Sequence, residues 1–178
     1  WKSLNLSGNS LGPKATEALV SSPKLAQVTS LDLSKNNTAQ GERLQTLLQE
    51  GRRTPTEIRH LSLAGNRLKS DFFAWLSTQE QWNSLESLDL SENNPGPEGI
   101  RALAAWQPPS SLRHLRLRKM RRSRAPDEMN EAWSALFASP LLRHLTTLVI
   151  DSNEWGEEAL TALLRSPWNS SLTSLTIL

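Results

Sequence analysis

The side chains best able to do chemistry in this 178-residue sequence are three histidines, several paired acids and a dense run of cations. Cysteine is absent, which excludes disulfides, thiolate metal sites and cysteine nucleophiles. His60, His114 and His144 lie far apart in the sequence and have no carboxylate at a fixed spacing, so they predict neither a metal site nor a general base. The sequence has no phosphate-binding glycine loop, nucleophile elbow or metalloprotease motif. We therefore expect no catalytic residue, no metal, no cofactor and no enzyme activity.

The cations are concentrated in one short stretch. Between Arg113 and Arg124, seven of twelve residues are Arg or Lys and none is acidic. Because the whole chain has a formal net charge of +2, the other residues sum to −5, from 13 basic and 18 acidic side chains. The positive charge is therefore a local patch, which predicts a surface that binds an acidic protein, a phosphate or nucleic acid.

An internal repeat must position these side chains. The pattern Leu-x-x-Leu-x-Leu-x-x-Asn recurs along the chain, with its second apolar position at residues 4, 31, 61, 88, 115, 148 and 175. Successive copies are 27, 30, 27, 27, 33 and 27 residues apart. The fifth copy has Met120 in place of the Asn, and its extra residues fall within 120–130.

Each repeat predicts one strand and one helix. Alternating apolar residues predict short strands near 2–6, 29–33, 59–63, 86–90, 113–117, 146–150 and 173–177. Small residues and Ala-Leu pairs then follow at intervals of three to four, as in one face of a helix, and Ser-Pro pairs end three of these helices, at Ser22-Pro23, Ser139-Pro140 and Ser166-Pro167. Since neither piece buries its apolar face alone, the copies must stack, with parallel strands on the concave side and helices on the convex side. The Asn after each strand is expected to bond backbone groups of its own and neighbouring turns.

The repeat resembles the leucine-rich repeat family, in particular its long-repeat, ribonuclease-inhibitor-like branch, over essentially the whole chain. The resemblance implies an α/β fold in which residues 1–178 form a single domain of six to seven units, a right-handed solenoid shaped like a horseshoe. The chain starts and stops on a strand with no polar capping repeat. We therefore expect it to be a segment of a longer array, and we expect its exposed end repeats to associate end to end.

Side chains between the leucines should face the concave surface, because alternate residues of a strand point to opposite sides. They form columns across the repeats, and the fifth repeat contributes cations to every column. The predicted partner-binding residues are Asp32, Asp89, Arg116, Arg118, Lys119, Arg121, Arg122 and Arg124.

Three functions are compatible with this surface. The first is a non-catalytic module or scaffold that binds a protein partner on its concave face. The second is a binder of nucleic acid or another polyanion through Arg113–Arg124, which ranks lower because residues 107–130 contain no Phe, Tyr or Trp on which bases could stack. The third is an accessory resembling the leucine-rich GTPase activators, which share this repeat type. No apolar run approaches the roughly 18 residues that cross a bilayer, so we expect no membrane partner and a cytoplasmic location.

The repeat also makes two predictions about where the tryptophans lie. Trp75 and Trp155 fall at apolar positions of the repeat and are predicted to lie in the core. Trp82, Trp106 and Trp168 fall near helix ends and return loops, and are predicted on the outer or lateral side.

Overall fold

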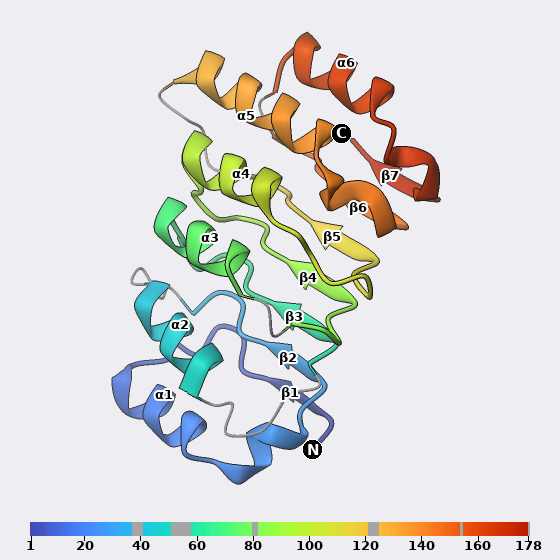
Figure 1. Ribbon diagram of the computed structural model, residues 1–178. Coiled ribbons are helices and arrows are strands. Elements are labelled where there is room, and N and C mark those ends of the chain that lie inside the picture. Colours follow the sequence, from blue (N-terminus) through green and yellow to red (C-terminus); the bar gives the residue numbers. More distant parts are fainter. Residues whose placement is uncertain (37–40, 51–57, 80–81, 121–124, 154, 178) are drawn as a thin grey trace.

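The computed structural model describes residues 1–36, 41–50, 58–79, 82–120, 125–153 and 155–177. Its strands form one seven-stranded parallel sheet in which each strand lies beside the next in sequence order. The strands run along one side of the molecule and the helices along the other (Figure 1). The strands are β1 (Ser3–Asn5), β2 (Ser30–Asp32), β3 (His60–Ser62), β4 (Ser87–Asp89), β5 (His114–Arg116), β6 (Thr147–Val149) and β7 (Ser174–Thr176).

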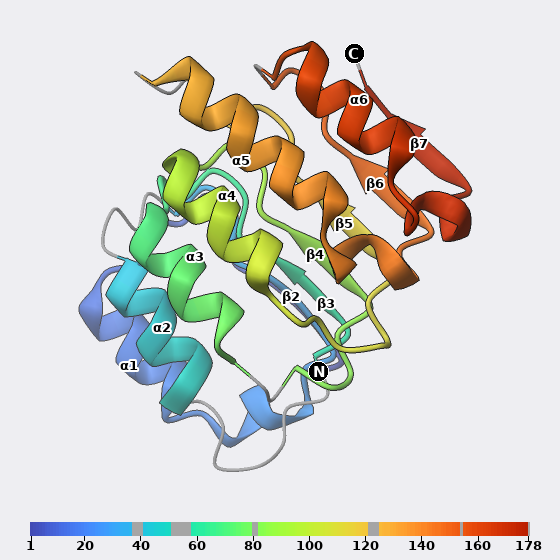
Figure 2. The ribbon, with the colours of Figure 1, turned by 45° about the horizontal axis from the view of Figure 1, so that its top comes forward.

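One α-helix follows each of the first six strands and returns the chain to the start of the next. Figure 2 shows α4, α5 and α6 packed side by side, so that the helices form a second layer against the sheet. Because helices are about 10 Å wide and strands pack about 4.8 Å apart, the sheet lies on the inner side of the curve. The α-helices are α1 (Pro13–Val20), α2 (Gly41–Glu50), α3 (Ser70–Ser77), α4 (Gly96–Ala105), α5 (Pro126–Ala138) and α6 (Glu157–Arg165), and the short 3₁₀ helices are η1 (Pro23–Gln27), η2 (Pro140–His144) and η3 (Asn169–Ser171).

The central leucine of each strand pairs with the central leucine of its neighbours, which confirms the fold predicted from the repeat. The paired positions are Leu4, Leu31, Leu61, Leu88, Leu115, Leu148 and Leu175. Residues added in the 30- and 33-residue steps therefore lie in the connections and leave the strand register unchanged. From Leu31 to Leu148 these side chains are at most 2% exposed, and burying each one stabilises the fold by about 1.5–3 kcal/mol.

Helices end where the Ser-Pro pairs predict. Helix α5 stops at Ala138, directly before Ser139-Pro140, and α6 stops at Arg165, directly before Ser166-Pro167. Proline lacks the N–H that would continue the helical ladder, so the chain turns there toward the next strand. None of the described helices is long and apolar enough to cross a membrane.

The tryptophans are placed more deeply than the sequence indicates. Trp82 and Trp106 are only 2% and 1% exposed and belong to the core, so the prediction that they lie on the outer or lateral side is wrong. Large rings under the return loops fill the space between the helix and strand layers. Trp75, Trp155 and Trp168 are partly buried against the same core.

The Asn after each strand forms a ladder of hydrogen bonds along the stack, as predicted. Asn66 is fully buried, and its Oδ1 accepts the backbone N–H of Asn36 at 3.0 Å. Its Nδ2 donates to the carbonyl oxygens of Leu33 and Leu63, at 2.9 and 3.0 Å. Each amide therefore fastens its own turn to the turn before it.

The fifth repeat interrupts this ladder. Met120 stands in the Asn position, is 7% exposed, and has no amide to offer the preceding turn. Its own backbone N–H still donates to Asn153 Oδ1 at 2.7 Å, so the ladder resumes in the sixth repeat. The joint between β4 and β5 is thus held by strand pairing and helix packing without a side-chain amide.

The residue directly before each ladder position turns the chain with a positive φ. It is glycine in two repeats, and in four others a non-glycine residue adopts the same left-handed conformation, which costs roughly 1–2 kcal/mol for a residue with a Cβ. These positions are Gly8, Lys35, Gly65, Glu92, Lys119 and Ser152. The turn fixes the direction in which these side chains project from the end of the sheet.

Candidate partner-binding surface

The exposed side of the sheet is built by the residues that flank each central leucine. In β2, β4 and β6 the central residue is buried and both flanking residues are half-buried, while both flanking residues of β5 are exposed. Alternation along the strand thus separates a core face from an open face. Of the predicted binding residues, Asp32 and Asp89 are half-buried on this face, and Arg116, Arg118 and Lys119 are exposed. Arg121, Arg122 and Arg124 lie outside the described residues.

Asp32 and Asp89 have a local structural role. Each accepts, through Oδ1, the backbone N–H two residues further on: Ser34 in the second repeat and Ser91 in the fourth, both at 2.9 Å. Asn5 does the same for Ser7 at 2.8 Å. A short acid or amide at this position therefore satisfies the N–H at the point where the strand ends. These bonds use one of the two oxygens of each carboxylate.

Arg116 occupies the same column in the fifth repeat but is a cation, so it cannot accept that bond. Instead, the backbone N–H of Arg118 donates to Ser91 Oγ in the preceding repeat, at 3.1 Å. Ser91 is 5% exposed and bridges the two strands from below the surface. Among the described residues Arg116 has no ion-pair partner, and its side chain is exposed.

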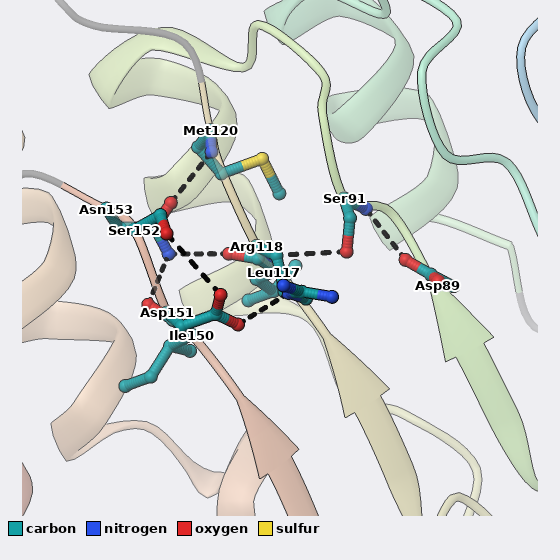
Figure 3. Close-up of polar contacts among 9 residues, drawn as sticks. All are labelled: Asp89, Ser91, Leu117, Arg118, Met120, Ile150, Asp151, Ser152 and Asn153. Atoms are coloured by element: carbon teal, nitrogen blue, oxygen red, sulfur yellow. Dashed lines mark hydrogen bonds and ion pairs between the residues drawn. The ribbon is translucent and has the colours of Figure 1, made fainter. Parts of the chain in front are cut away.

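Arg118 is held by Asp151 of the sixth repeat. Its Nε lies 2.6 Å from Asp151 Oδ1, and the Arg118 side chain is 48% exposed while that of Asp151 is 7% exposed. Figure 3 shows the two side chains meeting between the ends of the neighbouring strands. The buried acid is thus covered by the guanidinium, which stays in contact with solvent.

This pair shifts both titrations in favour of the charged forms. The hydrogen bond from Arg118 lowers the pKa of the Asp151 carboxyl below its ordinary value of 3.8, although burial acts in the opposite direction. The Asp151 hydrogen bond raises the pKa of Arg118, and the carboxylates of Asp89 and Glu92 add to this effect. Arg118 is therefore surrounded by acids from the fourth and sixth repeats.

Sequence reasoning missed Asp151 as a functional residue. It lies one repeat after Arg118, since 151 − 118 equals the 33-residue step of the fifth unit. Residues separated by one full step occupy the same column on neighbouring strands, so the sequence did contain the signal. Ser91 was missed for the same reason, as it occupies that column in the fourth repeat.

Other candidate groups do not come together into a site. His60 and His114 are exposed on β3 and β5, with β4 between them. In the part of the chain that the structure describes, no three His, Asp or Glu side chains form a cluster that could hold a metal ion. A shallow hollow on the helix side is lined by Asn130 and three neighbours, but the Asn130 amide is already used: its Oδ1 accepts the Gly156 N–H at 2.9 Å and its Nδ2 donates to Glu158 at 2.8 Å.

Comparison with known proteins agrees with this geometry. Residues 83–104 match a family model described as "Leucine Rich repeat". The tropomodulin C-terminal domain of Caenorhabditis elegans has a similar structure, with a TM-score of 0.56 at 17% identity, covering 84% of this chain and 89% of that domain. The leucine-rich repeat-containing protein LegL7 of Legionella pneumophila aligns over 99% of this chain and 74% of its own, with a TM-score of 0.42 and 22% identity. No curated protein matches the chain.

An open sheet of parallel strands in sequence order, with one helix between each pair of strands, defines the class as a solenoid of β/α repeats. The paired leucines, the Asn ladder and the family-model match then identify the units. The fold is therefore that of a leucine-rich repeat solenoid, and the unit at residues 83–104 matches the leucine-rich repeat family model.

Proposed function

We propose that this protein is a non-catalytic module that binds a protein partner on the inner face of its sheet. The observation that carries the proposal is a row of exposed cations at the end of β5 and just beyond it, which projects from a face of small and polar residues: Arg116, Arg118 and Lys119. Parallel pairing and a fixed register hold the backbone of β5 in place before any partner arrives. A surface ordered in advance loses less conformational entropy on binding, which favours affinity.

We also infer from the long repeats that the chain belongs to the ribonuclease-inhibitor-like branch. Support comes from the helices, which run from 8 residues in α1 to 13 in α5. Full helices on the outer side widen the stack there and curve the sheet inward, so that several strands can contact one partner together.

Site-directed photo-crosslinking tests the binding face. A photoreactive residue replaces Ser62 or Ser87 on the sheet, and in matched controls it replaces Glu131 or Ala135, which are exposed on α5. After irradiation in an extract, we expect a defined protein adduct from the sheet positions and none of the same mass from the helix positions. The double change Arg116→Glu and Arg118→Glu should abolish the adduct. Adducts that form equally from both faces, or only from α5, would contradict the proposal.

The polyanion alternative is favoured by one observation, the unpaired Arg116 beside Lys119 at the end of β5. A salt-dependent gel shift with random oligonucleotides, lost in the same double variant, would establish it. The accessory role resembling GTPase activators is separated by measuring GTP turnover of small GTPases with and without the protein. We also keep the proposal, made from the sequence, that the protein is located in the cytoplasm.

A further inference from the structure

We propose that the inner face of β5 is a receptor for acidic side chains of a protein partner, and that Asp151 orients its principal donor, Arg118. The proposal rests on the function proposed above and specifies the chemistry of the partner: carboxylates opposite β5. The proposal is more specific than a general positive patch, because binding depends on the direction of the Arg118 guanidinium. The neighbouring Asp151 sets that direction.

The first step concerns which donors of Arg118 are engaged. The ion pair with Asp151 uses Nε, the nitrogen closest to the side-chain stem. A guanidinium has five N–H donors in a planar fork, and its outer edge presents two nitrogens that match the two oxygens of a carboxylate. In Figure 3 the outer end of the Arg118 fork points away from Asp151, toward β4. A partner carboxylate can therefore approach that outer edge without displacing Asp151.

The second step concerns burial. The Asp151 side chain is 7% exposed, whereas Arg118 is 48% exposed. A carboxylate this buried is stable in its charged form only while it is paired, so Arg118 is held in one position by a partner that cannot swing into solvent. The receptor is ordered before binding, and little side-chain entropy is lost when a ligand docks.

The third step concerns spacing along β5. Arg116 and Arg118 are two residues apart, on the same face of the extended chain, and therefore about 6.6 Å apart along it. Alternate side chains of an extended acidic segment have the same separation. Arg116 is exposed, and among the described residues it has no ion-pair partner, so the two guanidinium groups can hold alternate acids of one segment. Lys119 adds a further exposed cation at the turn.

The fourth step distinguishes a protein from a polyphosphate chain. Asp89 and Glu92 in the fourth repeat and Asp151 in the sixth border the cations, and all three act electrostatically on Arg118. A nucleic acid strand crossing β5 would place phosphates against these acids on either side. The flanking positions of β3 to β6 also carry no Trp, Tyr or Phe on which bases could stack. A protein segment can place acids opposite β5 and a basic or neutral residue opposite Asp89.

The test compares two probes by fluorescence anisotropy at low salt. One is a labelled twelve-residue peptide that alternates Glu and Ser, and the other is a twelve-nucleotide oligo-deoxythymidine. The key variant is Asp151→Asn in the 178-residue chain, and its matched control is Asp71→Asn, which removes the same charge from the exposed start of α3. Circular dichroism melting verifies that each variant is folded.

An oriented receptor and a diffuse positive patch predict opposite signs. Asp151→Asn makes the protein more positive, so a diffuse patch would bind the peptide more tightly. An oriented receptor loses its alignment, and we expect peptide affinity to fall at least about threefold while the control variant binds as the parent does. Tighter peptide binding by Asp151→Asn would overturn the proposal, and so would oligonucleotide binding stronger than peptide binding.

A second variant keeps the test valid if Asp151→Asn does not fold. Arg118→Lys preserves the charge but removes the planar fork, and we expect at least about a threefold loss of peptide affinity, with no loss for Arg101→Lys on the outer face of α4. If Arg118→Lys binds the peptide as tightly as the parent protein does, the proposal of an oriented receptor is wrong. If this inference is wrong but the proposed function is right, the crosslinks from Ser62 and Ser87 will still form. The two failures can therefore be distinguished.

Discussion

At the scale of single residues, the ladder asparagines and the charged pair formed by Arg118 and Asp151 follow different rules. The asparagines are identical in nearly every repeat because each must satisfy backbone groups of two turns at once. Their role was predictable from the repeat alone. Arg118 and Asp151 differ from the other members of their column, and pairing them requires the 33-residue step of the fifth unit to be recognised as one full turn of the solenoid.

Replacing Asn66 with Ala tests the ladder. The change removes bonds to the Asn36 N–H and to the carbonyls of Leu33 and Leu63, which should lower the free energy of unfolding by about 2–4 kcal/mol because buried groups lose their partners. Urea denaturation measures the change. Asn9→Ala is the control, since Asn9 has the same repeat position but is exposed, and it should cost less than about 0.5 kcal/mol. Equal losses from the two changes would refute a structural role for burial of the amide.

At the scale of elements, the strands were the most predictable part of the fold. The large side chains that pack between the helix layer and the sheet were the least predictable. Central leucines mark each strand because they still pair with one another where the step lengthens to 30 or 33 residues. The burial of Trp82 and Trp106 was not predictable from position, because return loops follow no strict period and only the packed structure shows how much space lies beneath them. The binding face itself was predictable as alternate residues of the strands, whereas the bond between the Arg118 N–H and Ser91 depends on the distance between two strands.

Close packing of α3 and α4 predicts that Gly99 tolerates no side chain. A Cβ at Gly99 would lie 2.7 Å from Pro95 Cβ and 3.3 Å from Ser70 Cα. Gly99→Ala should therefore destabilise the protein by about 1–2 kcal/mol despite the higher helix propensity of alanine. Thermal melting followed by circular dichroism gives the result. Gly12→Ala is the matched control, since a Cβ there meets nothing within 4 Å, and a stability gain for Gly99→Ala would show that the helices can separate freely.

At the scale of the whole molecule, the two ends of the described stack expose apolar side chains. Trp1 is 65% exposed at one end, and Leu164 and Leu175 are 69% and 41% exposed at the other. Strands β1 and β7 each pair on one side only, which leaves two complementary parallel edges. Contact between unlike ends does not close on itself, so it adds further copies rather than stopping at a dimer.

We therefore expect a polypeptide of residues 1–178 to associate end to end. The weight-average mass from light scattering should rise with protein concentration, and Leu164→Glu together with Leu175→Lys should reduce it, because charge at the C-terminal edge opposes pairing. The same two types of substitution at Ala135 and Ala138, which are exposed on α5 within the stack, provide the comparison and should leave the mass unchanged. A constant monomer mass at high concentration would contradict the expectation.

Met120 leaves the joint between the fourth and fifth repeats without the amide that fastens its neighbours. The turns before it and after it are fastened by amides, but the joint between β4 and β5 is not, although α4 and α5 remain packed behind it. Side chains other than ladder amides cross this joint: Ser91 Oγ accepts the Arg118 N–H, and the Ser111 hydroxyl donates to the carbonyls of Asn83 and Leu85. Asp89 and Glu92 lie on one side of the joint and Arg116 and Arg118 on the other, so a small change in curvature there alters the distance between opposite charges. A partner that contacts the acids of the fourth repeat and the cations of the fifth repeat together therefore spans a joint that no ladder amide crosses.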